Sequence, residues 1–99
     1  MKAREVLRKI VTAILTNEQW EALDSWADDV LSGRVDGLED GLGTTKLIYH
    51  VNRGETQLAA AEFSKWCLVK GHINTQALAT RRAEAQHFIR GANVSPLSR

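Results

Sequence analysis

The glycines and the single proline of this chain limit its fold more than any other feature. Pro96 lies close to the end of the 99 residues, so no proline interrupts the sequence before it. Seven glycines divide that sequence into segments, within which apolar residues recur every three or four positions, as in amphipathic helices. A strand would need sustained alternation, and "KLIYHV" is the only candidate, with neighbours that favour helix. The sequence therefore predicts an all-α fold, a compact bundle of about five helices.

Capping residues predict where the second helix begins and ends. Thr16 precedes it, and Gln19 follows three positions later, which is the arrangement of a capping box. Gly33 is placed to end this helix in a left-handed conformation, and the glycine-rich, acidic stretch 34–43 then predicts a loop. The segment before Thr16 predicts a first helix, with apolar residues on one side at Val6, Leu7, Ile10, Val11 and Ile14.

Three further helices are predicted after the loop. Thr44 or Thr45 caps a short helix that Gly54 ends. The range 56–69 predicts a longer amphipathic helix with Phe63, Trp66 and Cys67 along one face, and the last helix includes 78–89.

The chain has the length of one small domain, and its charges nearly balance. We expect one helical domain over residues 1–91, followed by a flexible C-terminal tail over residues 92–99. Lys plus Arg is 13 and Asp plus Glu is 12, so the net charge is +1. Binding to nucleic acid or to an anionic membrane needs an excess of positive charge, so we expect neither. Cys67 is the only cysteine, which excludes an internal disulfide and favours a cytoplasmic location.

Few residues have the spacing that catalysis or metal binding requires. Asp24 and Asp28 are four positions apart on one predicted helix, with Asp29 beside them. Like charges at that spacing usually form a solvated face rather than an acid–base pair. Close ligand pairs such as C-x-x-C and phosphate-binding glycine loops are absent, so we expect no catalytic residue, no metal and no cofactor. The residue types that bind zinc occur singly, at His50, Cys67, His72 and His87.

The tryptophans and a pair of arginines leave alternatives open. Trp20 and Trp66 lie on predicted core faces, whereas Trp26 lies off the main apolar face of its helix. Trp26 is therefore either a second core contact or an exposed anchor for a partner. Arg81 and Arg82 are adjacent in the last helix, where they either bind a phosphate backbone or stabilise the fold.

Three stretches of the sequence, in order and with similar spacing, resemble a known family. They are "LTNEQWEALDSWADDVLSG", "GTTKLIYHVNRGETQLAAAEFSKWCLVKGH" and "LATRRAEAQHFIRG". Together they are similar to the C-terminal lobe of the phage-type lysozymes, the endolysin muramidases, over roughly residues 5–91. The resemblance implies that Arg81 and Arg82 anchor the last helix and argues against nucleic-acid binding. The matching positions are Leu15, Thr16, Gln19, Trp20, Ala22, Leu23, Ser25, Trp26, Thr44, Thr45, Leu47, Asn52, Gly54, Ala60, Ala61, Phe63, Trp66, Leu78, Arg81, Arg82, Glu84 and Phe88.

The sequence also departs from this family's pattern. The family's catalytic Glu, Asp and Thr belong to an N-terminal lobe before the matching region, and their signature, G-x-x-x-x-x-Y-x-D-x-x-G-x-x-T-x-G-x-G, is absent from this chain. The resemblance therefore implies a lobe without its catalytic part, and we expect the chain not to be an enzyme. Where the family has F-N-x-G, this chain has Asp28 to Leu31, followed by a longer and more acidic loop.

Two functional hypotheses follow. The first is a catalytically inactive, lysozyme-derived phage or prophage protein of the host cytoplasm, which binds a host or phage protein and inhibits or regulates a host enzyme or defence complex. The alternative is a peptidoglycan-binding or split-muramidase fragment that needs a separate catalytic lobe. The candidate partner-binding residues of the first hypothesis are Trp26, Asp28, Asp29, Arg34, Asp36, Glu39 and Asp40.

Overall fold

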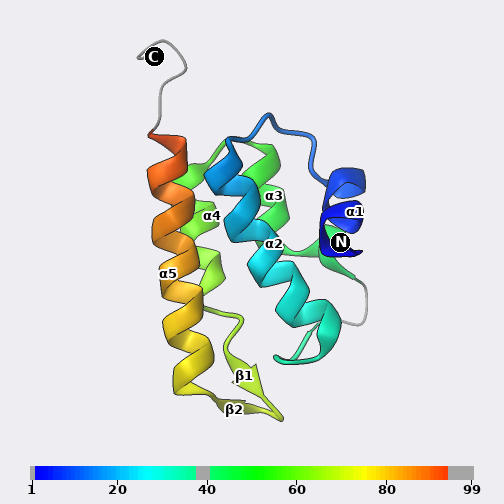
Figure 1. Ribbon diagram of the computed structural model, residues 1–99, viewed down its shortest axis with the longest axis vertical. Helices are drawn as coiled ribbons and strands as arrows, with labels where there is room; N and C mark the ends of the chain where they lie inside the picture. Colours follow the sequence, from blue (N-terminus) through cyan, green and yellow to red (C-terminus); the bar gives the residue numbers. More distant parts are fainter. Residues whose placement is uncertain (1, 38–40, 94–99) are drawn as a thin grey trace.

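The computed structural model describes residues 2–37 and 41–93, and within these ranges the chain is helical apart from one short hairpin (Figure 1). This confirms the predicted all-α fold. The elements, in order, are α1 (Lys2–Ile10), α2 (Asn17–Ser32), the 3-10 helix η1 (Leu42–Thr44), α3 (Lys46–Asn52), α4 (Thr56–Phe63), β1 (Leu68–Val69), β2 (His72–Ile73) and α5 (Thr75–Ala92). Among the described residues, no helix combines the length and apolar character needed to cross a membrane.

Helices α2 and α5 run antiparallel and side by side (Figure 1). Helix α2 has the predicted caps. The Thr16 hydroxyl accepts the backbone N–H of Gln19, while the Gln19 side chain accepts the N–H of Thr16 at 3.0 Å. Gly33 ends the helix with φ 80°, a left-handed conformation that favours glycine. Near the C-terminal end of α5, a Cβ on Gly91 would lie 2.7 Å from Oγ1 of Thr16, the N-cap of α2, so the two helices approach closely there.

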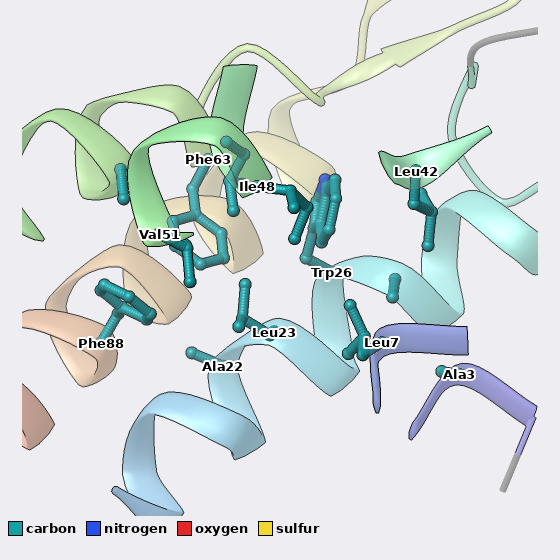
Figure 2. Close-up of a cluster of buried hydrophobic side chains, with 13 residues drawn as sticks. Ala3, Leu7, Ala22, Leu23, Trp26, Leu42, Ile48, Val51, Phe63 and Phe88 are labelled. Atoms are coloured by element: carbon teal, nitrogen blue, oxygen red, sulfur yellow. The ribbon is translucent and has the colours of Figure 1, made fainter. Parts of the chain in front are cut away.

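The core lies between α2 and the surrounding α1, η1, α3, α4 and α5, and aromatic residues fill its centre (Figure 2). Trp26 is fully buried and packs edge-to-face on Phe63, with ring centroids 6.5 Å apart, and on Trp66, at 5.6 Å. Phe63 in turn contacts Phe88 of α5 at 5.7 Å. Of the two alternatives for Trp26, the core contact is therefore correct. Trp66 is only half-buried at the edge of this cluster.

The first helix is shorter than its apolar pattern predicts. It ends at Ile10, and Ile14 is fully exposed instead of lying on the buried face. The side-chain amide of Asn52, at the end of α3, explains this difference. It donates to the carbonyl oxygen of Ile10 at 2.9 Å and accepts the backbone N–H of Thr12 at 2.7 Å. These bonds satisfy backbone groups at the helix end, so the chain leaves the helix there.

The predicted helix over 56–69 is also wrong in its second half. Helix α4 ends at Phe63, where the backbone N–H groups of Lys65 and Trp66 bond to carbonyls three residues back. The chain then forms the β1–β2 hairpin, in which Leu68 pairs with Ile73 and Val69 with His72. Strands of two residues are too short to produce a visible alternation in the sequence.

Helix α5 extends further than 78–89 at both ends. The Asn74 side chain caps it by accepting the N–H of Ala77 at 2.8 Å, and the helix continues through Gly91 to Ala92. The start of the predicted tail is therefore helical, and residues 94–99 lie outside the described residues.

Candidate functional site

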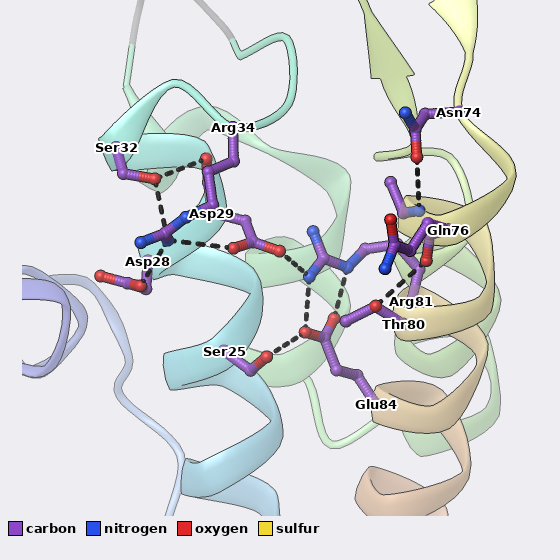
Figure 3. Close-up of polar contacts among 11 residues, drawn as sticks. Ser25, Asp28, Asp29, Ser32, Arg34, Asn74, Gln76, Thr80, Arg81 and Glu84 are labelled. Carbon is purple, nitrogen blue, oxygen red and sulfur yellow. Dashed lines mark hydrogen bonds and ion pairs between the residues drawn. The ribbon is translucent and has the colours of Figure 1, made fainter.

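A polar cluster joins α2 to α5, centred on the fully buried side chain of Arg81 (Figure 3). Arg81 Nη2 donates to Asp29 Oδ2 of α2 at 2.5 Å and to Glu84 Oε2 of its own helix at 2.6 Å. Ser25 of α2 donates its hydroxyl to the same oxygen of Glu84. Arg81 thus stabilises the helix pair, as the resemblance implied, whereas Arg82 points to solvent.

The carboxyl group of Glu84 is buried within this cluster. Burial raises its pKa above the ordinary value, because the ionised form loses its hydration. The hydrogen bonds from Ser25 and Arg81 oppose this shift, and the charge of Asp29 adds to it. The Glu84 side chain is 6% exposed, and neither of the two grooves described below reaches it. Its ionisation therefore affects the stability of the helix pair.

The aspartates predicted to meet a partner are largely engaged by this chain itself. Arg34 Nη1 lies 2.8 Å from Asp28 Oδ2 and 3.2 Å from Asp29 Oδ1, so Asp29 bridges Arg34 and Arg81 (Figure 3). Asp24 points the other way and pairs with Arg4 of α1 at 2.5 Å. It is thus partly buried rather than part of a solvated face, and the carboxylates of α2 do not act as a pair.

The remaining candidate residues fall into three situations. Trp26 offers no surface to a partner because it is fully buried, which corrects its inclusion in the candidate surface. Asp36 lies at a groove, described next. Glu39 and Asp40 lie outside the described residues. A partner-binding surface therefore stays a prediction for Asp28, Asp29, Arg34 and Asp36. The side chains of these four residues already make contacts within the chain.

A groove of about 380 Å³ lies between the loop after α2 and the segment that links α4 to β1. On the first side the lining also includes Thr44 of η1 and Lys46, the first residue of α3. The second side carries Lys65 and the half-buried indole of Trp66. Sequence reasoning missed this site because its walls are some twenty residues apart in the chain, and only the fold brings them together. The lining residues are Asp36, Gly37, Thr44, Thr45, Lys46, Glu62, Lys65, Trp66 and Leu68.

A second, larger depression of about 570 Å³ lies at the opposite end of α2, against the turn between α3 and α4. Three of its polar side chains are already used by the fold. Thr16 and Gln19 cap each other, and Glu55 bonds to Nδ1 of His50 at 2.9 Å. The hydrogen bond to His50 lowers the pKa of Glu55.

Metal ligands do not converge in the part of the chain that the structure describes, where no group of three or more His, Cys, Asp or Glu side chains could hold an ion. His87 instead approaches Glu21 across the α2–α5 pair, with 2.8 Å between Nε2 and Oε1, and Cys67 is buried.

Comparison with known proteins gives two concordant matches. The phage lysozyme family model matches residues 1–85. The endolysin of Bacillus phage PZA is 32% identical over 96 residues, which cover 94% of this chain and 33% of that protein. The chain thus spans about a third of the length of this curated relative. Lysozymes and endolysins are enzymes, so these matches contradict the expectation that the chain is not an enzyme.

Proposed function

We propose a function from the premise that this chain belongs to the phage lysozyme family, which is the observation that carries the proposal. The chain acts as the helical lobe of a phage muramidase, and its task is to hold the glycan strand of peptidoglycan during cleavage. Of the two hypotheses raised by the sequence, this develops the one in which peptidoglycan is the ligand.

The groove between Lys46 and Trp66 has the chemistry that such a ligand needs. Amino sugars present apolar ring faces together with hydroxyl and amide groups, and a half-exposed indole provides a matching apolar surface. The Thr44 hydroxyl donates to the carbonyl oxygen of Gly41 at 3.0 Å, and its lone pairs can accept a hydrogen bond from a sugar hydroxyl or amide group. Lys46 is exposed at the rim and complements the carboxylates of the peptide and lactyl groups on a muramyl residue.

Cleavage of a glycosidic bond generally requires two carboxyl groups on either side of it. The groove contains two carboxylates, and this chain uses both for other contacts. Asp36 accepts backbone N–H groups of the hairpin, and Glu62 pairs with Lys65 at 2.7 Å. We therefore assign cleavage to carboxylates of a further segment that docks beside this groove, in the same polypeptide or in a separate one.

The hypothesis of a host-protein inhibitor finds little support in the structure. It depends on an acidic surface with free carboxylates, and three of its acids, Asp28, Asp29 and Asp36, are paired within the fold. Its anchor, Trp26, is buried.

The test is binding of the full chain to soluble, uncross-linked glycan strands of alternating N-acetylglucosamine and N-acetylmuramic acid. We expect saturable binding by calorimetry, accompanied by a change in tryptophan fluorescence because Trp66 lines the groove. The variant Lys46→Gln should weaken binding about three- to tenfold, as expected for loss of one exposed charge contact.

The matched control is Lys9→Gln, which removes the same charge from an exposed position on α1. It should bind as tightly as the wild type. Wild-type protein that shows no glycan binding, or equal losses in both variants, would refute the assignment of the groove.

A further inference from the structure

The β1–β2 hairpin adjoins the groove through Leu68, and it is too short to be stable on its own. Each strand has two residues. Isolated two-stranded hairpins are marginal in water even when they are longer. Leu68 is 37% exposed and Ile73 68% exposed, so the burial of apolar side chains contributes little here. The position of the hairpin must therefore depend on contacts with another part of the chain.

Asp36, in the loop after α2, provides such contacts. Its backbone N–H donates to the carbonyl oxygen of Leu68 at 2.7 Å. Its carboxylate accepts the backbone N–H of Lys70 at 2.9 Å with one oxygen and that of Gly71 at 2.8 Å with the other. One residue thus makes three hydrogen bonds to the strand and turn.

The turn needs this carboxylate for a conformational reason. Lys70 has φ 53° and Gly71 has φ 81°, both in the left-handed region. A residue with a Cβ occupies that region at an energetic cost, so Lys70 is strained in this turn. Two neighbouring N–H groups that converge on one anion stabilise the arrangement, because hydrogen bonds to a charged acceptor are stronger than neutral ones.

Asp36 is itself fixed by the core on both sides. Val35 is 3% exposed, so the residue before it is buried. The backbone at Gly37 lies directly on α2, since a Cβ at that position would come within 2.9 Å of Val30 Cγ1. The position of Asp36 therefore follows that of α2, and through its hydrogen bonds so does the position of the hairpin.

We propose that Asp36 is a positioning residue that clamps the β1–β2 hairpin to the loop after α2 and thereby sets the width of the groove. This inference rests on the proposed function, because the width determines how well a glycan strand fits between Lys46 and Trp66. The clamp is independent of any contact between Asp36 and the ligand. Loosening it moves Leu68, and the segment that leads from Trp66, away from the opposite wall.

The experiment compares the wild type, Asp36→Asn and Glu5→Gln in the full chain. Asparagine keeps the size of aspartate but has one acceptor oxygen, so one of the two turn amides loses its partner. Glu5→Gln removes the same charge from an exposed position on α1. The readouts are the hydrogen-exchange rates of the Lys70 and Gly71 amides, measured by NMR, and the affinity for soluble glycan strands.

In Asp36→Asn we expect at least one of the two amides, the one that loses its acceptor, to exchange about tenfold faster and the glycan affinity to fall about tenfold, with melting nearly unchanged. Glu5→Gln should match the wild type in all readouts. As a second variant, Gly37→Ala should also weaken glycan binding, because its Cβ displaces the loop from Val30 while the carboxylate stays.

Exchange rates in Asp36→Asn equal to those of the wild type would overturn the clamp. Faster exchange with unchanged glycan affinity would overturn its role in the groove. A wild type that binds no glycan would refute the proposed function and this role together, whereas the exchange rates would still decide whether Asp36 holds the turn.

Discussion

Helix α2 is held against its neighbours by two kinds of contact on different sides. Toward α3 and α4 it presents Trp26, which is fully buried against Phe63 (Figure 2) and also packs edge-to-face on Trp66. Toward α5 it presents Ser25 and Asp29, which meet Glu84 and the buried Arg81 (Figure 3). The apolar side gains stability from the area that it removes from water, and the polar side must first compensate the hydration that its charges lose.

This difference determines how each kind of contact responds to a substitution. An apolar cluster loses stability in proportion to the atoms removed, plus the cavity that remains. A buried charge cluster fails as a unit, because removing one member leaves the others buried without partners. Apolar packing therefore accounts for the strength of the α2 interface, and the charge cluster fixes the alignment of α2 with α5.

The largest effect is expected in the aromatic cluster. Trp26→Ala removes a fully buried ring and should lower the free energy of unfolding by about 3–5 kcal/mol, out of the roughly 5–15 kcal/mol of a domain this size. Urea unfolding measures this change. Leu58→Ala, on the exposed side of α4, is the control and should change little. A loss under about 1 kcal/mol for Trp26→Ala would mean that the core does not depend on this ring.

Next in size is the loss of the buried arginine. Arg81→Ala should cost about 2–3 kcal/mol, because the buried carboxylate of Glu84 loses its cationic partner and Asp29 keeps only its exposed partner Arg34. The double variant Arg81→Met with Glu84→Leu removes two of the buried charges and should be more stable than Arg81→Ala. If the double variant is instead the less stable of the two, the buried charges contribute net stability, and apolar packing alone does not account for the strength of the α2 interface.

The pH dependence of Glu84 is a smaller effect with a definite sign. Its pKa is raised in the folded state, so the folded chain binds this proton more tightly than the unfolded chain does. The resulting stability is complete below the ordinary value of 4.5 and is lost as the pH rises through the raised pKa. The stability advantage of the wild type over Glu84→Gln should therefore shrink as the pH rises from 4.5.

Urea melts at a series of pH values measure this difference. Glu5→Gln is the control, since it makes the same charge change at an exposed position on α1. An advantage of the wild type that instead grows with pH would show that the pairing with Arg81 outweighs the burial of the carboxylate.

The smallest effect is expected one residue away from the buried arginine. Arg82→Ala changes an exposed side chain and should alter the free energy of unfolding by less than about 0.5 kcal/mol. Adjacent residues on a helix point about 100° apart, which separates the two arginines into different environments. Equal losses in Arg81→Ala and Arg82→Ala would place both side chains in the cluster, contrary to the structure.

Local signals in the sequence were sufficient for much of the helical framework. The Thr16–Gln19 capping box, the left-handed Gly33 and the Thr45 cap are each formed by residues at most four positions apart, so their geometry depends on the local chain alone. The helical spacing of apolar residues likewise predicted the all-α fold. The ordered match of three stretches also indicated the phage lysozyme family, which the comparisons then confirmed.

Only the tertiary structure decided which side chains meet. Asn52 bonds to the end of α1 across forty residues of sequence, and Asp36 bonds to a turn more than thirty residues later. No local pattern in the sequence predicts either contact. Trp26, Asp28 and Asp29 were expected at a partner surface because a sequence shows charge and size but not direction. The fold turned Trp26 into the core and Asp29 toward Arg81, because the energy of these groups depends on burial and on distant partners.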